Sequence, residues 1–175
     1  MSHKPRIATE IERKYVIYIP DLIEMRKMTG YTESKITQIY LVSSAGETHR
    51  VRARTKNGVT VYTQTRKIRI DEMSATEIEG EISEGEFSEL LSLADKNRRP
   101  ITKVRHAFYY KSQLFEVDVY PEWTSSCIME TELPSRDTAV EFPPFINIIK
   151  DVTGEKKYSN ASMAKQFPPE LTLTL

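Results

Sequence analysis

Acidic and basic side chains in this chain gather in groups whose members are two residues apart. Residues 10–14 are Glu-Ile-Glu-Arg-Lys, residues 50–54 are Arg-Val-Arg-Ala-Arg, and residues 77–81 are Glu-Ile-Glu-Gly-Glu. Shorter groups of the same kind occupy residues 103–105, 116–118 and 130–132. Since residues i, i+2 and i+4 of a β-strand point to the same face, each group would set charges of mostly one sign side by side.

A single segment of this kind is most simply a half-buried strand with a solvated charged face. Six such segments weaken that interpretation, because like charges on neighbouring positions of one face repel each other. This repulsion would be relieved if the strands surrounded one common site, with metal cations bound among the acidic residues and an anion bound among the basic ones. Arginine and lysine bind phosphate oxygens, and Mg²⁺ or Mn²⁺ binds carboxylate and phosphate oxygens together. The pattern therefore indicates a metal-assisted site for a triphosphate.

The elements that position these groups are predicted strands. Alternation of apolar and polar residues places them at about 7–19, 36–42, 48–55, 59–70, 75–83, 101–110, 113–120 and 127–134. Tight turns are expected at Asn57-Gly58 and near Lys111-Ser112, and such short links imply antiparallel pairing. Strands from most of the chain can reach one site if the sheet closes, and eight strands enclose room for one small ligand. We therefore predict a mainly β (α+β) fold, a closed eight-stranded antiparallel β-barrel with peripheral helices.

The helices are expected between the strands. Helical spacing of apolar residues predicts helices over 21–28 and 85–97. A third is expected to begin at Ser135, to be interrupted by Pro143-Pro144 and to continue over 145–152, and a short one is expected over 160–165. We expect one domain over 1–175, with a core at about 8–165, and an appended tail after Pro169.

Composition limits the classes of function. Lysine plus arginine and aspartate plus glutamate number 25 each, so no net field favours nucleic acid or a membrane. A hydrophobic content of 39% and a charged content of 29% are typical of a globular protein. The single cysteine, Cys127, allows no intramolecular disulfide. No stretch approaches the roughly 20 apolar residues of a membrane helix and no leader is evident, so we expect a cytoplasmic protein.

The order of the charged groups resembles the CYTH proteins, also called triphosphate tunnel metalloenzymes. Residues 9–14 match the Glu-x-Glu-x-Lys opening of that family, and the later groups follow in the family's order over roughly 8–165. The resemblance implies an antiparallel tunnel of eight strands that is open at both ends, with helices outside. It is closest to the short bacterial inorganic-triphosphatase branch, because Gln38-Ile39-Tyr40-Leu41 stands where cyclase-like members usually carry Asp-x-Tyr-Phe.

The resemblance also implies roles for individual residues. Those implied as metal ligands are Glu10, Glu12, Asp118, Glu130 and Glu132. The residues implied to bind the phosphates are Lys14, Arg52, Arg54, Lys67, Lys103, Arg105 and, as a lesser candidate, Lys157. Those implied as catalytic are Glu77, Glu79, Lys14 and Asp118. A bulge could bring Arg66 to the tunnel in place of Lys67, and Arg50, Glu81 and Glu116 are expected at the rim.

The function expected from these residues is metal-dependent hydrolysis of the terminal phosphoanhydride of a triphosphate, with inorganic tripolyphosphate as the best single substrate. Two Mg²⁺ or Mn²⁺ ions are expected as cofactors. The alternatives are a class IV-type adenylate cyclase, a nucleoside or thiamine triphosphatase, and a non-catalytic polyphosphate-binding module. The expected partner is a small-molecule triphosphate, with no nucleic acid and no membrane, and a homodimer is left open.

Overall fold

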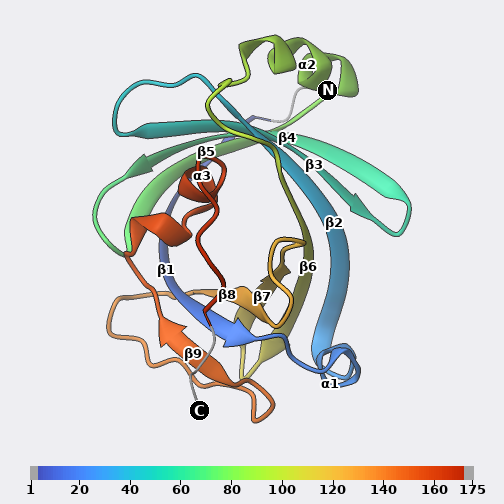
Figure 1. Cartoon of the computed structure of the whole chain (residues 1–175), viewed down its shortest axis with the longest axis vertical. Helices are drawn as coiled ribbons and strands as arrows, with labels where there is room; N and C mark the ends of the chain where they lie inside the picture. Colours follow the sequence, from blue (N-terminus) through green and yellow to red (C-terminus); the bar gives the residue numbers. More distant parts are fainter. Residues whose placement is uncertain (1–3, 172–175) are drawn as a thin grey trace.

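The protein is built on one antiparallel sheet that closes on itself (Figure 1). The computed structural model describes residues 4–171. Its strands are β1 (Arg6–Tyr18), β2 (Thr29–Leu41), β3 (Glu47–Lys56), β4 (Val59–Arg69), β5 (Ser74–Ile82), β6 (Ile101–Tyr110), β7 (Gln113–Val119), β8 (Ser126–Glu132) and β9 (Ile148–Asp151). They lie in the order β5-β4-β3-β2-β6-β7-β8-β1-β9, and a further β5–β1 pairing closes an eight-stranded barrel. The predicted fold class is confirmed, and β9 is an additional strand.

Strand β1 forms the seam of the barrel. Its residues 6–11 pair with β5, and its residues 12–18 pair with β8 on the other edge. Strand β9 takes up the part of the first edge that β5 leaves free, opposite residues 15–17. The first strand of the chain therefore joins elements that lie far along the sequence.

Tight turns join the neighbouring hairpins as the sequence predicts. Asn57 and Gly58 have φ values of 49° and 76° between β3 and β4, and Lys111 and Ser112 have φ values of 45° and 64° between β6 and β7. Two successive residues with positive φ match the right-handed twist of antiparallel strands. The turn residues thus set the register that fixes which side chains point inward.

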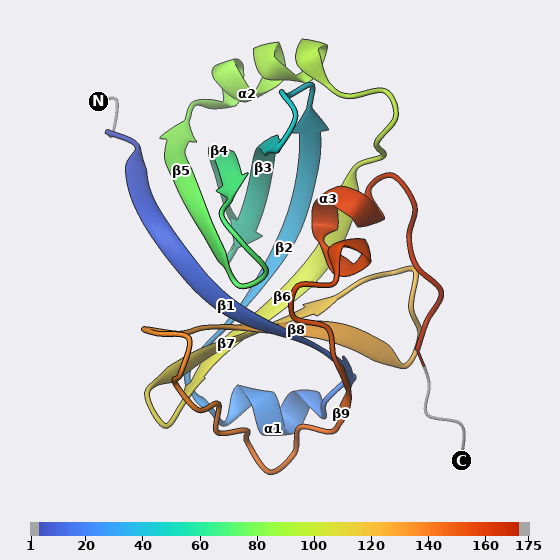
Figure 2. The ribbon, with the colours of Figure 1, turned by 90° about the vertical axis from the view of Figure 1, so that its left-hand side faces the viewer.

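The helices are short and lie outside the barrel wall or at its mouth (Figure 2). They are α1 (Leu22–Arg26), α2 (Glu84–Leu90) continued by η1 (Leu91–Leu93), η2 (Lys156–Tyr158) and α3 (Asn160–Met163). Ser83 and Glu86 form a capping box at the start of α2. The helix predicted from Ser135 through 145–152 is wrong, because residues 148–151 pair with the edge of β1 and the preceding segment forms turns.

Two apolar cores lie on opposite faces of the barrel wall. The outer core includes Tyr15, Phe108 and Phe115 and is covered by α1 and the segment before β9. The inner core includes Val16, Tyr120, Trp123 and Tyr158 and fills the end of the barrel next to η2 and α3. Tyr158 of η2 and Met163 of α3 are themselves part of the inner core. The interior is therefore apolar at this end, whereas the resemblance implied a tunnel open at both ends.

No helix within residues 4–171 is long and apolar enough to span a bilayer.

The described part of the segment after α3 is tied to the barrel, whereas residues 172–175 of the tail expected after Pro169 lie outside the described residues. The indole Nε1 of Trp123 donates to the carbonyl oxygen of Pro168 at 3.0 Å, and the Phe167 ring lies 5.4 Å from that of Trp123. The Glu170 carboxylate accepts backbone N–H bonds at 3.1, 2.6 and 2.7 Å from three successive residues, and also accepts from their hydroxyls. These residues are Thr124, Ser125 and Ser126. Although burial opposes the effect, the N–H bonds lower the pKa of Glu170 to about 2.

Loss of this carboxylate should destabilise the fold in a pH-dependent way. Glu170→Gln should lower the free energy of unfolding at pH 7 by about 1 to 2 kcal/mol, since charged hydrogen bonds are weakened or lost. Because the folded-state pKa is depressed, the difference between the proteins should be full above about pH 5 and should shrink as the pH falls toward 2. Urea unfolding at several pH values measures it. Glu89→Gln, on the exposed face of α2, is the matched control and should change stability little; an equal loss in that variant would contradict the prediction.

Candidate active site

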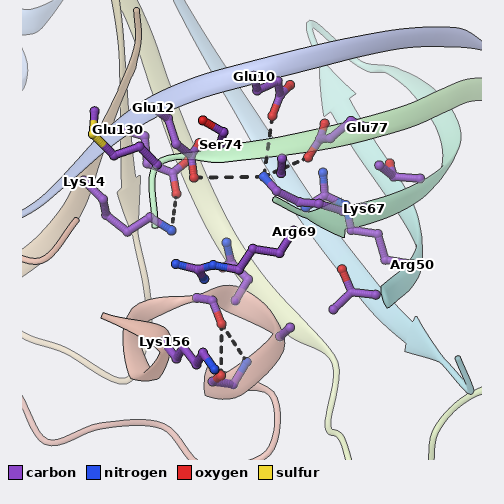
Figure 3. Close-up of a pocket in the computed structure, with 18 of the residues that line it drawn as sticks. Glu10, Glu12, Lys14, Arg50, Lys67, Arg69, Ser74, Glu77, Glu130 and Lys156 are labelled. Carbon is purple, nitrogen blue, oxygen red and sulfur yellow. Dashed lines mark hydrogen bonds and ion pairs between the residues drawn. The ribbon is translucent and has the colours of Figure 1, made fainter. Parts of the chain in front are cut away.

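The inward charged residues of several strands face one cavity of about 610 Å³ inside the barrel (Figure 3). The carboxylates that line its acidic part are Glu10, Glu12, Glu77, Glu79, Glu116, Glu130 and Glu132. The basic side chains that line it are Lys14, Arg50, Arg52, Arg54, Lys67, Arg69, Arg98, Arg105, Lys156 and Lys165. The alternation of each strand thus brings most of the predicted site residues together.

The acidic wall is formed by β1, β5 and β8. Glu12 lies directly opposite Glu132 in the β1–β8 register, and Lys14 lies opposite Glu130. Glu77 of β5 lies beside Lys67 of β4 in the register of those strands. Six carboxylates from three adjacent strands therefore line the cavity, and they include four of the five predicted metal ligands.

Lys67 places its ammonium among the carboxylates of this wall. Its Nζ lies 3.0 Å from Glu77 Oε1, 3.5 Å from Glu10 Oε2 and 4.0 Å from Glu12 Oε1 (Figure 3). Although burial opposes the effect, the carboxylates raise the pKa of Lys67. Burial and the neighbouring Glu77 raise the pKa of Glu10 to about 8. Glu10 is therefore largely protonated at neutral pH, because one ammonium does not offset the crowding of the carboxylates in this wall.

Lys14 provides a second internal cation at this wall. Its Nζ lies 2.7 Å from Glu130 Oε1, and Arg105 Nη2 lies 3.5 Å from the other oxygen of that carboxylate. Although burial opposes the effect, Lys14 and Arg105 hold the pKa of Glu130 well below its usual value. Glu130 is therefore ionised at neutral pH.

The basic wall is formed mainly by β3, which lies four positions from β8 in the closed strand order and so faces it. Arg52 donates to both oxygens of Glu79 at 3.3 Å, and Arg50 reaches the same carboxylate at 4.0 Å. No ion pair within the described residues holds Arg54. The Nε atoms of Arg50 and Arg52 are buried without a hydrogen-bond partner, and burial together with Arg50 lowers the pKa of Arg52 to about 10. Both guanidiniums remain charged and share a single carboxylate, Glu79, so the positive charge is not fully compensated, which favours an anion beside them.

Two predicted site residues lie in the wall beneath the cavity and do not line it. Lys103 Nζ lies 2.5 Å from Asp118 Oδ2, and both side chains are 1% exposed. Asp118 also accepts from Nε and Nη2 of Arg105 at 2.7 and 2.8 Å. Both oxygens of Asp118 are thus engaged by Lys103 and Arg105. The geometry suits a role in orienting Arg105, which does line the cavity, better than direct contact with metal or phosphate.

Two further expectations depend on which way a side chain points. Lys67 faces the cavity, whereas Arg66 lies outside and pairs with Glu47 at 2.5 Å. Lys157 is not brought to the cavity, because its ammonium lies over the Tyr158 ring at 5.0 Å and near Glu155. Its neighbour Lys156 lines the cavity instead.

Several cavity residues were not singled out from the sequence. Arg69 shares the parity of Lys67 on β4, so the strand pattern contained a signal for it. Three other basic residues lie outside the strands, on a loop, on η2 and at the end of α3: Arg98, Lys156 and Lys165. The alternation of inward and outward residues in strands does not apply there, so it could not predict them. Tyr40 faces inward from β2, and its hydroxyl accepts from Gln38 Nε2 at 3.1 Å.

The donor set suits a hard divalent cation. Glu10, Glu12, Glu130 and Glu132 supply only carboxylate oxygens, which Mg²⁺ and Mn²⁺ prefer. The ammonium of Lys67 already lies among three of the wall's carboxylates, so these oxygens can surround a cation. Within residues 4–171, no three acidic, histidine or cysteine side chains converge tightly enough to form a ready-made metal cage. Metal ligation at this wall would therefore require the carboxylates to move closer together.

Comparison with known proteins identifies the family. A family model described as the CYTH domain matches residues 8–160. The inorganic triphosphatase NE1496 has a similar crystal structure, with 27% sequence identity and a TM-score of 0.59, and the match covers 93% of this chain and 98% of that chain. No curated protein matches the chain in sequence.

Two archaeal structures share the fold at lower identity. The PH1819 protein from Pyrococcus horikoshii OT3 is 23% identical with a TM-score of 0.57, and a conserved hypothetical protein from Pyrococcus furiosus is 19% identical with a TM-score of 0.54. Each match covers 73% of this chain and 80% of the other chain. The family model spans most of the sequence. The chain belongs to the CYTH domain family.

Proposed function

We propose that this protein is a divalent-metal-dependent phosphohydrolase that cleaves the terminal phosphoanhydride of inorganic tripolyphosphate. The observation that carries the proposal is the pair of opposed walls in one cavity, acidic on β1, β5 and β8 and basic on β3. A polyphosphate has oxygens for both walls, since guanidiniums bind them directly and carboxylates bind them through a shared metal ion.

The basic residues would orient the substrate and stabilise its charge. Phosphoryl transfer requires little covalent chemistry from the protein, so positioning and electrostatic stabilisation supply most of the rate enhancement. Arg50 and Arg52 have donor atoms without partners in the cavity wall, and Arg54 has no ion pair among the described residues. Arg105 is held by Asp118 at a fixed position nearby.

The acidic residues would hold the metal and accept a proton. Glu10, Glu12, Glu130 and Glu132 are the proposed ligands, and a bound Mg²⁺ or Mn²⁺ supplies Lewis acidity and a bound water of lowered pKa. Hydrolysis forms a bond from water oxygen to the terminal phosphorus, breaks the bridging P–O bond and releases pyrophosphate and phosphate. Glu79 is engaged by Arg52 and by Thr65 at 2.7 Å, whereas Glu77 is held by Lys67. Glu77 is the proposed proton acceptor, because it is ionised at neutral pH: although burial opposes the effect, Lys67 and Arg50 hold its pKa below its usual value.

The lining of the cavity favours an inorganic substrate. Tyr40 is the only aromatic side chain among the described residues that line it, so the structure offers no pair of rings to stack a nucleobase or a thiamine ring. The solved relative with 27% identity is named an inorganic triphosphatase. Both points support tripolyphosphate over ATP or thiamine triphosphate.

A substrate comparison tests the proposal. The protein is incubated with tripolyphosphate, ATP or thiamine triphosphate, each with Mg²⁺ and with Mn²⁺, and the products are identified. Pyrophosphate and phosphate from tripolyphosphate, at the highest kcat/KM of the three substrates, are expected. Cyclic AMP from ATP would indicate a cyclase, and binding of tripolyphosphate without turnover would indicate a binding module; either result would refute the proposal.

Removing one proposed metal ligand should abolish turnover and leave the fold intact. Glu12→Gln or Glu132→Gln keeps the side-chain volume but replaces a charged oxygen donor. Activity should fall to background throughout a Mg²⁺ titration, while circular dichroism and the melting temperature change little. EDTA should inactivate the wild type, and added Mg²⁺ should restore it. Wild-type activity in either variant would show that these carboxylates are not ligands.

Removing one guanidinium should weaken catalysis and phosphate binding together. Arg54→Ala should lower kcat/KM by about 30- to 1,000-fold, which corresponds to about 2 to 4 kcal/mol for the loss of one preorganised donor. Tripolyphosphate with Ca²⁺ should then raise the melting temperature of this variant less than that of the wild type. Lys56→Ala is the matched control, because Lys56 follows Arg54 on the same face of β3 but does not line the cavity. Equal shifts in Arg54→Ala and the wild type would assign Arg54 to a solvated face.

A further inference from the structure

Lys67 occupies the position among the acids that a divalent cation would need. Its Nζ is within 4.0 Å of oxygens from Glu10, Glu12 and Glu77, which belong to two adjacent strands. Lys67 itself comes from β4, the strand between the acidic β5 and the basic β3. Its side chain therefore crosses from its own strand toward the acidic wall (Figure 3).

An ammonium and a divalent cation cannot share this position. Two like charges within about 4 Å repel each other strongly at the effective dielectric constant of a protein interior. A cation that binds Glu10 and Glu12 must therefore displace Lys67, whose own ion pairs are then lost. Lysine suits such a displacement, because its charge is compact and its four-carbon stem is flexible.

The basic side of the cavity offers a new partner for Lys67 only when an anion is present. In the register of β3 and β4, Lys67 lies opposite Thr48, and Thr65, one position inward on the same face, lies opposite Arg50. A displaced ammonium beside Arg50 would meet further positive charge unless phosphate oxygens lay between them. The energetic cost of moving Lys67 thus depends on whether a polyphosphate is bound.

We propose that Lys67 is an exchangeable internal counter-ion, which lies among Glu10, Glu12 and Glu77 until a divalent cation replaces it and then transfers its ammonium to the phosphate chain. The inference rests on the proposed function. The exchange makes the binding of metal and of polyphosphate mutually dependent, in addition to any direct contact between the two ligands. The metal displaces Lys67 from the acidic wall, and the polyphosphate offers the displaced ammonium a new partner, so each ligand lowers the free-energy cost of binding the other. Such coupling is reciprocal, so each ligand raises the affinity for the other by the same factor.

Mn²⁺ binding to the protein without substrate provides the first test. Calorimetric titration of Mn²⁺ should give a dissociation constant roughly 10- to 100-fold lower for Lys67→Met than for the wild type, since the competing cation is removed. Lys156→Met is the matched control, because it removes the same charge from the same cavity and forms no ion pair with the acidic wall. Its Mn²⁺ affinity should change less than threefold. Lys67→Arg keeps a cation at the position and should remain close to the wild type, which also covers the case in which Lys67→Met does not fold.

Tripolyphosphate binding provides the second test. Its affinity is measured from melting-temperature shifts, once in EDTA and once in Ca²⁺. The loss caused by Lys67→Met should be at least fivefold greater in Ca²⁺, because Lys67 is free to bind phosphate only after a divalent cation has replaced it.

The outcomes separate this inference from the proposed function. Unchanged or absent Mn²⁺ binding in Lys67→Met, or an equal gain in Lys156→Met, would overturn the exchange even if the wild type hydrolyses tripolyphosphate. Equal losses of tripolyphosphate affinity with and without Ca²⁺ would also overturn it. Tighter Mn²⁺ binding in Lys67→Met alone, in a protein that hydrolyses no triphosphate, would support the exchange and reject the function.

Discussion

Charges of one sign can be gathered inside a protein only if charge of the other sign is placed among them. The acidic wall of this barrel meets that condition with lysines, since Lys67 lies among Glu10, Glu12 and Glu77, and Lys14 lies against Glu130. The basic wall meets it only in part. Glu79 is shared between Arg52 and Arg50, and Arg54 has no ion pair among the described residues. Positive charge therefore remains uncompensated on β3, and an anionic ligand that bound there would neutralise it.

Depth along the barrel decides which inward residues meet a ligand. The strands that carry Lys14, Arg105 and Glu130 continue into the inner apolar core, which includes Val16, Ile101 and Ile128. That core closes one end of the interior and is covered by η2 and α3, which are in turn tied down through Pro168 and Glu170. The charged cavity therefore borders a packed apolar core on this side.

Much of this arrangement could be predicted from the sequence, because the period of two fixes the face to which each strand residue points. It predicted that Glu12 and Glu132 share a cavity, and it left open whether Lys67 or, after a bulge, Arg66 faces that cavity; the structure places Lys67 there. Period alone does not encode depth, so Lys103 and Asp118 were expected in the cavity although they lie beneath it.

The parts that could not be predicted depend on tertiary packing. Lys156 and Lys165 reach the cavity because η2 and α3 pack on the inner core. No local sequence pattern predicts that packing. Residues 148–151 form a strand because the edge of β1 is available to pair with them, which overrides the local preference for a helix.

The seam at β1 has a consequence for how the site comes into being. Glu12 meets Glu132 only after the 119 residues between them have been placed, and β1 must also pair with β5 for the barrel to close. Contacts so distant in sequence form late, because the chain entropy of closing a long loop must first be overcome. A sheet that lacked the β5–β1 pairing would hold the acids of β5 apart from those of β1 and β8, so the acidic wall would be incomplete. The complete cavity is thus a property of the closed barrel, and a ligand that bound all three strands would stabilise the closure.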